Sequence, residues 1–144
     1  MFISDVIGTK GARVVTALST ETVVKAVGML AHHKIGALVI EDAHMHPVGI
    51  FSERDFINAI AKVGAAALTT PVHGWMSSPI VSCRPSDRID AALGLMTMRR
   101  IRHLPVMEDG KLRGIVSIGD LIKHRLDEKE LEANVLLELS RLRT

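Results

Sequence analysis

The chain has 144 residues, a length that fits one ordinary domain or two small units that share a core. Hydrophobic residues make up 47% of the chain and aromatic residues only 3%, so the core must be built from aliphatic side chains and methionine. The formal net charge of +2 is too small to draw the whole molecule onto nucleic acid.

The cysteine content and the N-terminal residues predict a cellular compartment. The single cysteine, Cys83, excludes an internal disulfide and fits a reducing environment. The N-terminal Met-Phe-Ile-Ser-Asp lacks the charged and apolar regions of a secretory signal, and no apolar run approaches the ~18 residues of a membrane span. We expect a soluble, cytoplasmic protein with no membrane contact.

The first half of the chain predicts a strand, a helix, two strands and a second helix. Residues 14–16 form a short β-branched run, and a polar cap at Thr20 precedes the first helix. Strands are expected at 37–40 and 49–51, and the second helix begins at Ser52. One apolar stripe runs along the first helix, formed by Val23, Val27 and Leu30.

The second half repeats this order. A strand is expected at 80–82, a cap at Ser86, strands at 104–107 and 114–116, and a helix from Ser117. Its first helix carries an equivalent apolar stripe, formed by Ile89, Leu93 and Met96.

Residues 49–57 and 114–122 show that the second half duplicates the first. They share five identical positions at a constant offset of 65, which is 114 minus 49. Upstream, matches such as Ala26 with Ala92 lie at an offset of 66. Each β-α-β-β-α copy leaves one face of a small sheet uncovered, so we predict an α/β (α+β) fold in which the two copies cover one another.

The pattern Gly-x-x-Ser-x-x-Asp occurs once in each copy, where a strand ends and a helix begins. A glycine without a Cβ lets a ligand or a neighbouring strand approach the backbone. A serine at a helix N-terminus can donate to a phosphate, and an aspartate in the first turn can accept both hydroxyls of a ribose. The residues are Gly49, Ser52 and Asp55 in the first copy, and Gly114, Ser117 and Asp120 in the second.

The same Ser-x-x-Asp spacing is also typical of a capping box, which stabilises the start of a helix in any protein. One occurrence alone would favour that interpretation. The duplication and the preceding glycine favour ligand binding, because capping would also accept Thr, Asn, Glu or Gln at these positions.

Both copies resemble CBS (cystathionine-beta-synthase) domains, in which this motif closes the second strand pair. The Arg-His-Leu-Pro-Val segment at 102–106 also matches the family pattern, and the resemblance extends from about Ile3 to Lys123. It implies a tandem pair, called a Bateman module, packed about a pseudo-twofold axis. We divide the chain into a first CBS repeat (1–62), a linker (63–71), a second repeat (72–126) and a C-terminal helix (127–144).

The resemblance also implies two clefts, each composite, that commonly hold AMP, ADP, ATP, NAD or S-adenosylmethionine. We expect AMP, ADP or ATP as the ligand. NAD(H) is a second candidate, and S-adenosylmethionine is less expected than either. The implied nucleotide-binding residues are Thr16, Gly36, Ala37, Ile50, Ser52, Arg54, Asp55, Ser82, Arg102, His103, Ile115, Ser117 and Asp120. The Asp55 cleft is expected to bind a phosphate chain better, because Arg54 precedes Asp55 whereas Gly119 precedes Asp120.

Two other functions stay open: a nucleotide hydrolase that uses Asp55 or Asp120, and a purely structural dimerisation domain. We predict no catalysis, because phosphate-loop motifs are absent and Cys83 lacks a positioned base. We predict no metal site, because His44 and His46 lie in a loop without further ligands. The basic cluster at 99–102 lacks aromatic partners for nucleic acid.

The C-terminal tail has no Gly or Pro from 127 to 143 and predicts a helix that continues the one before it. Leu131, Val135, Leu139 and Leu142 form an apolar stripe at i, i+4, i+8 and i+11. The stripe either folds back on the chain's own core or contributes to a homodimer, and we favour the homodimer. A regulated protein is the other expected partner, in line with a ligand-sensing role.

Overall fold

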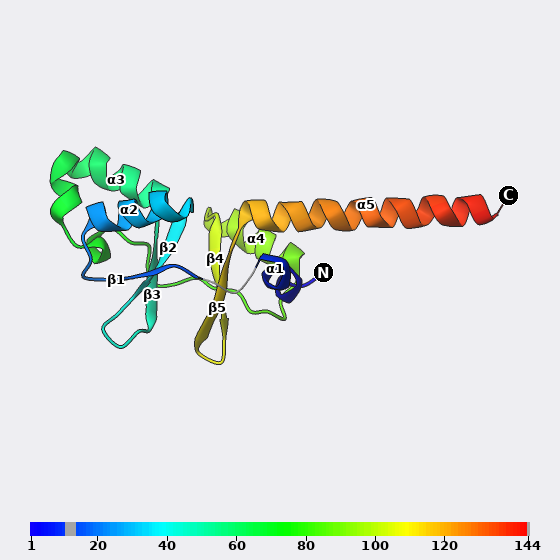
Figure 1. The fold of residues 1–144 in the computed structure, drawn as a ribbon, viewed down its shortest axis with the longest axis horizontal. Coiled ribbons are helices and arrows are strands. Elements are labelled where there is room, and N and C mark those ends of the chain that lie inside the picture. Colours follow the sequence, from blue (N-terminus) through cyan, green and yellow to red (C-terminus); the bar gives the residue numbers. More distant parts are fainter. Residues whose placement is uncertain (11–13, 144) are drawn as a thin grey trace. The chain divides into compact units, whose positions relative to one another are not determined.

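The computed structural model describes residues 1–10 and 14–143 (Figure 1). The chain divides into two compact units. We call Arg13–Val81 the first unit, and Met1–Ala12 together with Ser82–Thr144 the second unit. By this division, residues 63–81 belong to the first unit, and the N-terminal helix belongs to the second unit.

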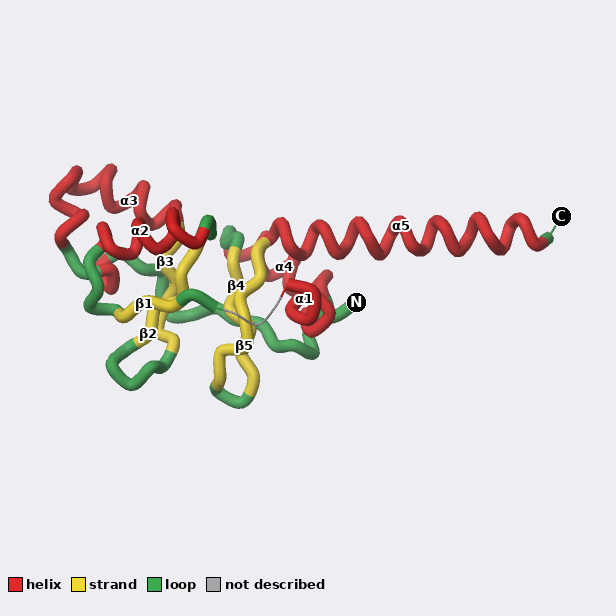
Figure 2. Tube along the Cα trace, viewed as in Figure 1, coloured by secondary structure: helices red, strands yellow, loops and turns green. Residues whose placement is uncertain are grey.

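The first unit contains the predicted β-α-β-β-α order. Its elements are β1 (Thr16–Leu18), α2 (Val23–His33), β2 (Ala37–Glu41), β3 (Pro47–Ser52) and α3 (Glu53–Val63), followed by two short 3-10 helices, η1 (Gly64–Thr69) and η2 (Val72–Gly74). The strands form one sheet in the order β1-β2-β3, with β1 parallel and β3 antiparallel to β2 (Figure 2).

Helix α2 begins later than the sequence predicts. Its N-cap is Thr22, whose side chain accepts a hydrogen bond from the backbone N–H of Lys25, and not Thr20. β1 extends to Leu18, so the chain needs the intervening turn before the helix can start. The helix buries Val23, Ala26 and Leu30 in a core that also contains Leu38, Ile40, Phe51 and Val72. A residue beyond the predicted repeat, Val72, thus completes the core of the first unit.

The second unit repeats the helices but has a smaller sheet. Its elements are α1 (Ile3–Lys10), α4 (Ile89–Arg99), β4 (His103–Glu108), β5 (Lys111–Ser117) and α5 (Ile118–Leu142). β4 and β5 pair antiparallel.

The strand predicted at 80–82 is absent from the described chain. Only Cys83 pairs with β4, in a single parallel bridge to Val106. Its N–H donates to Pro105 O at 3.0 Å, and its carbonyl accepts from Met107 N–H at 2.8 Å. Pro85 follows two residues later and has no N–H to extend this ladder. The predicted cap at Ser86 is wrong as well, because α4 starts after Arg88, which makes no side-chain cap.

Helix α1 is an element that the sequence interpretation missed. Its Ile3 and Val6 are almost fully buried, and the Ile7 side chain would lie 3.6 Å from a Cβ added at Gly114 in β5. The backbone N–H of Ile3 donates to Asp87 O at 2.8 Å, which fixes the start of α1 beside the loop that leads into α4. The N-terminal segment therefore covers the sheet of the second unit.

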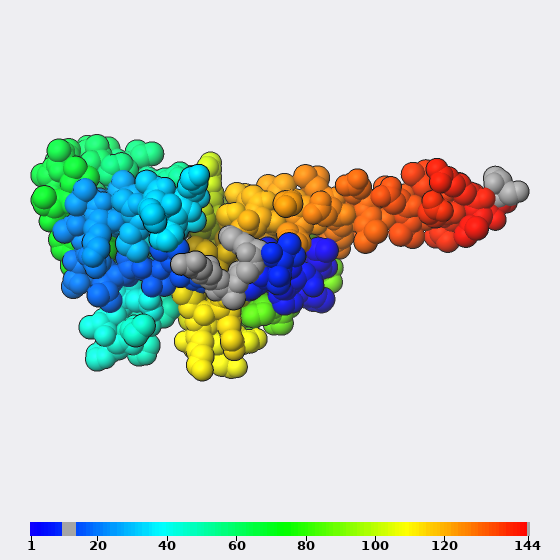
Figure 3. All heavy atoms as spheres, in the orientation of Figure 1, coloured from blue at the N-terminus to red at the C-terminus, as the bar shows by residue number. Residues whose placement is uncertain are grey.

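Helix α5 runs without a break over 25 residues, so the predicted continuation of the motif helix into the tail is confirmed. Every residue from 129 to 143 is exposed, and Figure 3 shows this stretch as an isolated rod of side chains. The predicted alternative, in which the tail folds back on its own core, is not what the structure shows. No helix in the described part of the chain is long and apolar enough to span a membrane.

Candidate functional site

The motif of the first unit forms a capping box at the start of α3. Ser52 is the N-cap, and its Oγ accepts a hydrogen bond from the N–H of Asp55 at 3.4 Å. In return, Asp55 Oδ2 accepts from the N–H of Ser52 at 2.9 Å and from the Ser52 hydroxyl at 3.0 Å. The capping interpretation of Ser-x-x-Asp is therefore correct as local structure, and ligand binding has to act on a carboxylate that already has partners.

Asp55 is also held from outside the motif, by Ser77. The Ser77 hydroxyl donates to Asp55 Oδ1 at 3.0 Å. Asp55 is the one charged residue that is buried among those whose burial the structure describes, with 9% of its surface exposed. An ionised carboxylate offers about four acceptor positions. Three of these are used, two on Oδ2 and one on Oδ1, so the remaining capacity lies on Oδ1.

Gly49 is required because the chain itself approaches its backbone. Ile50 and Ser77 exchange two backbone hydrogen bonds, of 3.0 and 2.8 Å. A Cβ at Gly49 would lie 2.7 Å from Met76 Sδ and 2.9 Å from the carbonyl oxygen of Ser77. Of the two reasons that the sequence offered for this glycine, the structure shows the approach of a neighbouring extended segment.

The motif of the second unit has the same cap but looser surroundings. Ser117 accepts from the N–H of Asp120 at 3.1 Å, and Asp120 Oδ2 accepts from the N–H of Ser117 at 2.9 Å. Asp120 is half-buried, whereas Asp55 is buried. A Cβ at Gly114 would lie 3.6 Å or more from Ile7, which is ordinary van der Waals contact. The two motifs are therefore alike in sequence and different in packing.

In both units, the start of the second strand lies beside the motif serine. Gly36 O accepts a hydrogen bond from the N–H of Glu53 at 3.1 Å, and Ala37 lies opposite Ser52 in the sheet.

The second unit repeats this arrangement. Arg102 O accepts from the N–H of Ile118 at 2.8 Å, and His103 lies opposite Ser117. The family resemblance implies that these four residues bind the nucleotide, and the structure brings them to the helix N-termini.

Four other predicted site residues lie further from the helix starts. Thr16 and Ile50 both pair with Val39, one on each side of β2. Ile115 pairs with Pro105, and Ser82 is exposed just before the Cys83 bridge. Arg54 and Arg102 are exposed. Each unit thus contains its own set of the predicted site residues. The composite clefts that the family resemblance implies stay a prediction.

Ser77 and Met76 are the site residues that sequence reasoning missed. They lie in the segment after Trp75, whose indole N–H donates to Thr70 Oγ1 at 3.0 Å and helps to hold this segment against the first unit. The one available signal was Gly49, since a strand glycine indicates a close backbone neighbour. At the offset of 66, Ser77 corresponds to Gly11, which has no hydroxyl and lies outside the described residues.

The other candidate side chains have structural explanations. Burial, with a smaller contribution from Asp87, raises the pKa of the Cys83 thiol to about 12, so Cys83 is not a thiolate at neutral pH. Asp42 accepts from the backbone N–H groups of His44 and His46, at 2.8 and 3.0 Å, and the bond from His46 is the main cause of its lowered pKa. The described residues include no group of three His, Cys, Asp or Glu side chains that could hold a metal ion.

Comparison with known families assigns both halves of the chain. The model of the family described as "CBS domain" matches residues 3–62 and 72–127. A curated relative, the mitochondrial CBS domain-containing protein CBSX3 of Arabidopsis thaliana, is 32% identical, with 92% of this chain and 71% of the relative covered. Among curated relatives of 32% to 34% identity, the chain spans 32% to 71% of their length.

Solved structures match the fold over most of the chain. The crystal structure of the CBS-domain protein ATU1752 from Agrobacterium tumefaciens is 43% identical, with a TM-score of 0.84, and the match covers 86% of this chain and 92% of that one. The CBS domain protein PAE2072 from Pyrobaculum aerophilum, solved in complex with AMP, is 28% identical with a TM-score of 0.79. That match covers 92% of this chain and 99% of PAE2072.

Proposed function

The chain belongs to the CBS-domain family, as a tandem pair, and we propose that it is a regulatory module that binds an adenine nucleotide and has no catalytic activity. The observation that carries this proposal is the duplicated motif. In two separate units, a serine and an aspartate lie together at a helix N-terminus, beside the start of the second strand. The AMP complex of PAE2072 supports the choice of ligand class.

AMP is the first ligand that we propose, followed by ADP, ATP and NAD(H). A helix N-terminus attracts a phosphate because its free N–H groups and dipole favour negative charge. Arg54 follows Ser52 by two positions and is exposed in the first turn of α3, where a guanidinium would favour a longer phosphate chain in the Asp55 site. S-adenosylmethionine is a weaker candidate on the same argument, since it carries no phosphate.

The hydrogen bonds of Asp55 set a condition on how a ribose binds there. Because Oδ2 already accepts two bonds, a ribose hydroxyl has to use Oδ1, together with Ser77 or in its place. A bidentate ribose contact at Asp55 therefore requires a rearrangement in which Ser52 or Ser77 gives up a bond. Such a rearrangement is a physical route by which nucleotide binding could change the position of the 76–77 segment.

We propose that this movement of the 76–77 segment is the signal by which the module reports that a nucleotide is bound. A ligand shifts a conformational equilibrium only through a difference in its affinity for the two states, and a displaced Ser77 supplies such a difference. The regulated target is another protein, the module acts as a homodimer in the cytoplasm, and neither nucleic acid nor a membrane is a partner.

A thermal-shift panel tests the proposal with AMP, ADP, ATP, NAD, NADH and S-adenosylmethionine. A ligand at 100 times its dissociation constant adds about 2.7 kcal/mol to the free energy of unfolding, which is a readily measured shift. We expect a shift with AMP at least. If none of the six compounds moves the transition, the chain is a structural domain and the proposal is wrong. Nucleotide turnover that disappears in Asp55→Asn would instead support the hydrolase.

Asparagine is the informative replacement at Asp55. Asp55→Ala removes the acceptor of three hydrogen bonds at once, so loss of binding could reflect damage to the start of α3. Asp55→Asn keeps the shape of the side chain and one acceptor oxygen but removes the charge that a bidentate ribose contact uses.

A further inference from the structure

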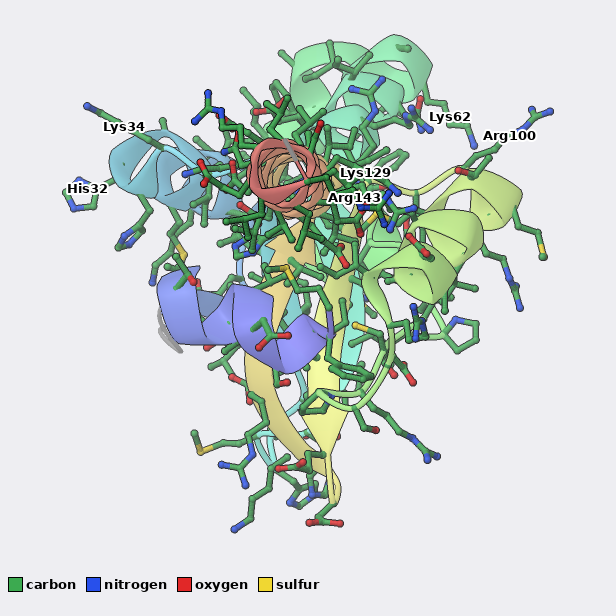
Figure 4. All side chains as sticks on the ribbon, turned by 90° about the vertical axis from the view of Figure 1, so that its right-hand side faces the viewer. His32, Lys34, Lys62, Arg100, Lys129 and Arg143 are labelled. Atoms are coloured by element: carbon green, nitrogen blue, oxygen red, sulfur yellow. The ribbon has the colours of Figure 1, made fainter. Side chains whose placement is uncertain are left out.

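The distal half of α5 carries an apolar surface that its own unit does not cover. Ion pairs tie the first half of the helix to its unit: Arg125 pairs with Asp90 at 3.0 Å, and Glu128 lies 3.5 Å from the N-terminal amino group. Beyond Glu128, every residue to 143 is exposed. Figure 4 shows α5 viewed along its axis from its C-terminal end.

Four residues make up a line on this surface, which we call the α5 stripe: Leu131, Val135, Leu139 and Leu142. With 100° between successive residues, these four positions fall within about 80° of one another around the helix. They are between 50% and 81% exposed. An isolated helix of this length is marginal in water, and exposed apolar patches of this kind mark interaction sites.

The charges beside the stripe decide which partner fits. The segment 127–132 contains four acidic residues and one lysine, whereas 138–143 contains two arginines and one glutamate. A second copy of the helix in the parallel direction would place acidic segment against acidic segment. In the antiparallel direction, the acidic segment of each copy faces the basic end of the other.

The residues of the stripe fit the same antiparallel register. When Val135 lies opposite Leu139 of the partner copy, Leu131 lies near the partner's Leu142, and this pairing is reciprocal. Glu132 and Arg143 project on the same side of the stripe, about 20° apart around the helix. In an antiparallel pair the same sides meet, so Glu132 faces Arg143 of the second copy at both ends of the contact.

We infer that the α5 stripe binds a second copy of this chain as an antiparallel helix pair, with Glu132 opposite the second copy's Arg143. This inference deepens the homodimer named in the proposed function and does not depend on nucleotide binding. The contact involves fewer than the roughly 20 to 30 residues a side of a standard interface, so the helix pair alone gives a dimer that dissociates on dilution.

Sedimentation velocity of the full chain, over about a hundredfold range of concentration, measures this dimer through mass action. Leu139→Asp should weaken the dimer at least about tenfold, because it places a charge in the centre of the stripe. Leu137→Asp is the matched control, since Leu137 is 56% and Leu139 52% exposed, and Leu137 points away from the stripe. Both variants should keep the helical circular dichroism of the wild type.

Charge exchange tests the direction of the helices. Glu132→Arg and Arg143→Glu should each weaken the dimer, and the double variant should restore it, as should an equimolar mixture of the two single variants. A monomer at every concentration, equal effects of Leu137→Asp and Leu139→Asp, or no rescue in the double variant would overturn the inference. Isothermal titration of Leu139→Asp with AMP keeps the two proposals separate, because the inference predicts that nucleotide binding to each chain persists.

Discussion

Ser77 donates a hydrogen bond to Oδ1 of Asp55 at 3.0 Å, although 22 positions separate the two residues in the sequence. The motif aspartate of the first unit is therefore positioned by a segment outside the motif. The corresponding residue of the other copy, Gly11, has no side chain that could make this bond. The Ser77 hydroxyl therefore has no counterpart at the aligned position of the other copy.

Ser77→Ala should lower the free energy of unfolding by about 1 kcal/mol, the net value of a hydrogen bond at a partly exposed position. The change removes the Oδ1 partner of Asp55 and leaves the bonds from Ser52 in place. Urea denaturation measures this loss in the free energy of unfolding. Ser78→Ala is the control, because the described structure shows no hydrogen bond from that hydroxyl. Equal stability of the two variants would mean that the Ser77 bond contributes nothing.

Gly49→Ala should destabilise the protein by about 1 to 3 kcal/mol, because the new Cβ would overlap Met76 and the Ser77 carbonyl. The motif supplies its own control, since Gly114→Ala places a Cβ at ordinary contact distance from Ile7. That variant should be neutral or slightly stabilising, as alanine loses less conformational entropy than glycine in a strand. Thermal unfolding of the pair gives the comparison, and a smaller loss in Gly49→Ala than in Gly114→Ala would contradict the described packing.

The stability of the protein should fall as the pH rises from about 9 to about 12. Burial raises the pKa of the Cys83 thiol from 9.0 to about 12, so over this range the folded chain keeps a proton that the unfolded chain releases. Unfolding is then favoured by up to about 1.4 kcal/mol per pH unit. The chain has no tyrosine to titrate in the same range. Denaturation of Cys83→Ala at several pH values should show a shallower slope, and an unchanged slope would exclude this cause.

The repeats could be predicted from the sequence because their signals are local. Ser52 and Ser117 were expected at the helix starts, and both are N-caps there, since side-chain capping depends only on residues three positions apart. The strands around Leu38 and Leu104 were recognised for a similar reason, as short apolar runs bounded by polar loops. The CBS family followed from these elements and the motif together.

The features that sequence analysis missed depend on contacts between distant segments. Helix α1 has eight residues, too few for a periodic pattern, and is stabilised by burial of Ile3 and Val6 in the second unit. The strand expected at 80–82 has β-branched residues, but only Cys83 bonds to β4. Ser77 carried no signal of its own, because an isolated serine is compatible with any surface loop.

Nucleotide affinity of the two motif aspartates tests the central claim most directly. Isothermal titration with AMP should give measurable binding to the wild-type chain and at least about tenfold weaker binding to the Asp55→Asn, Asp120→Asn double variant, since each charge-assisted bond contributes about 1.5 to 3 kcal/mol. Asp109→Asn, in the exposed turn between β4 and β5, is the charge-matched control and should bind AMP as the wild type does. No heat of binding from any adenine nucleotide, or equal affinity in the wild type and the double variant, would contradict the proposed function.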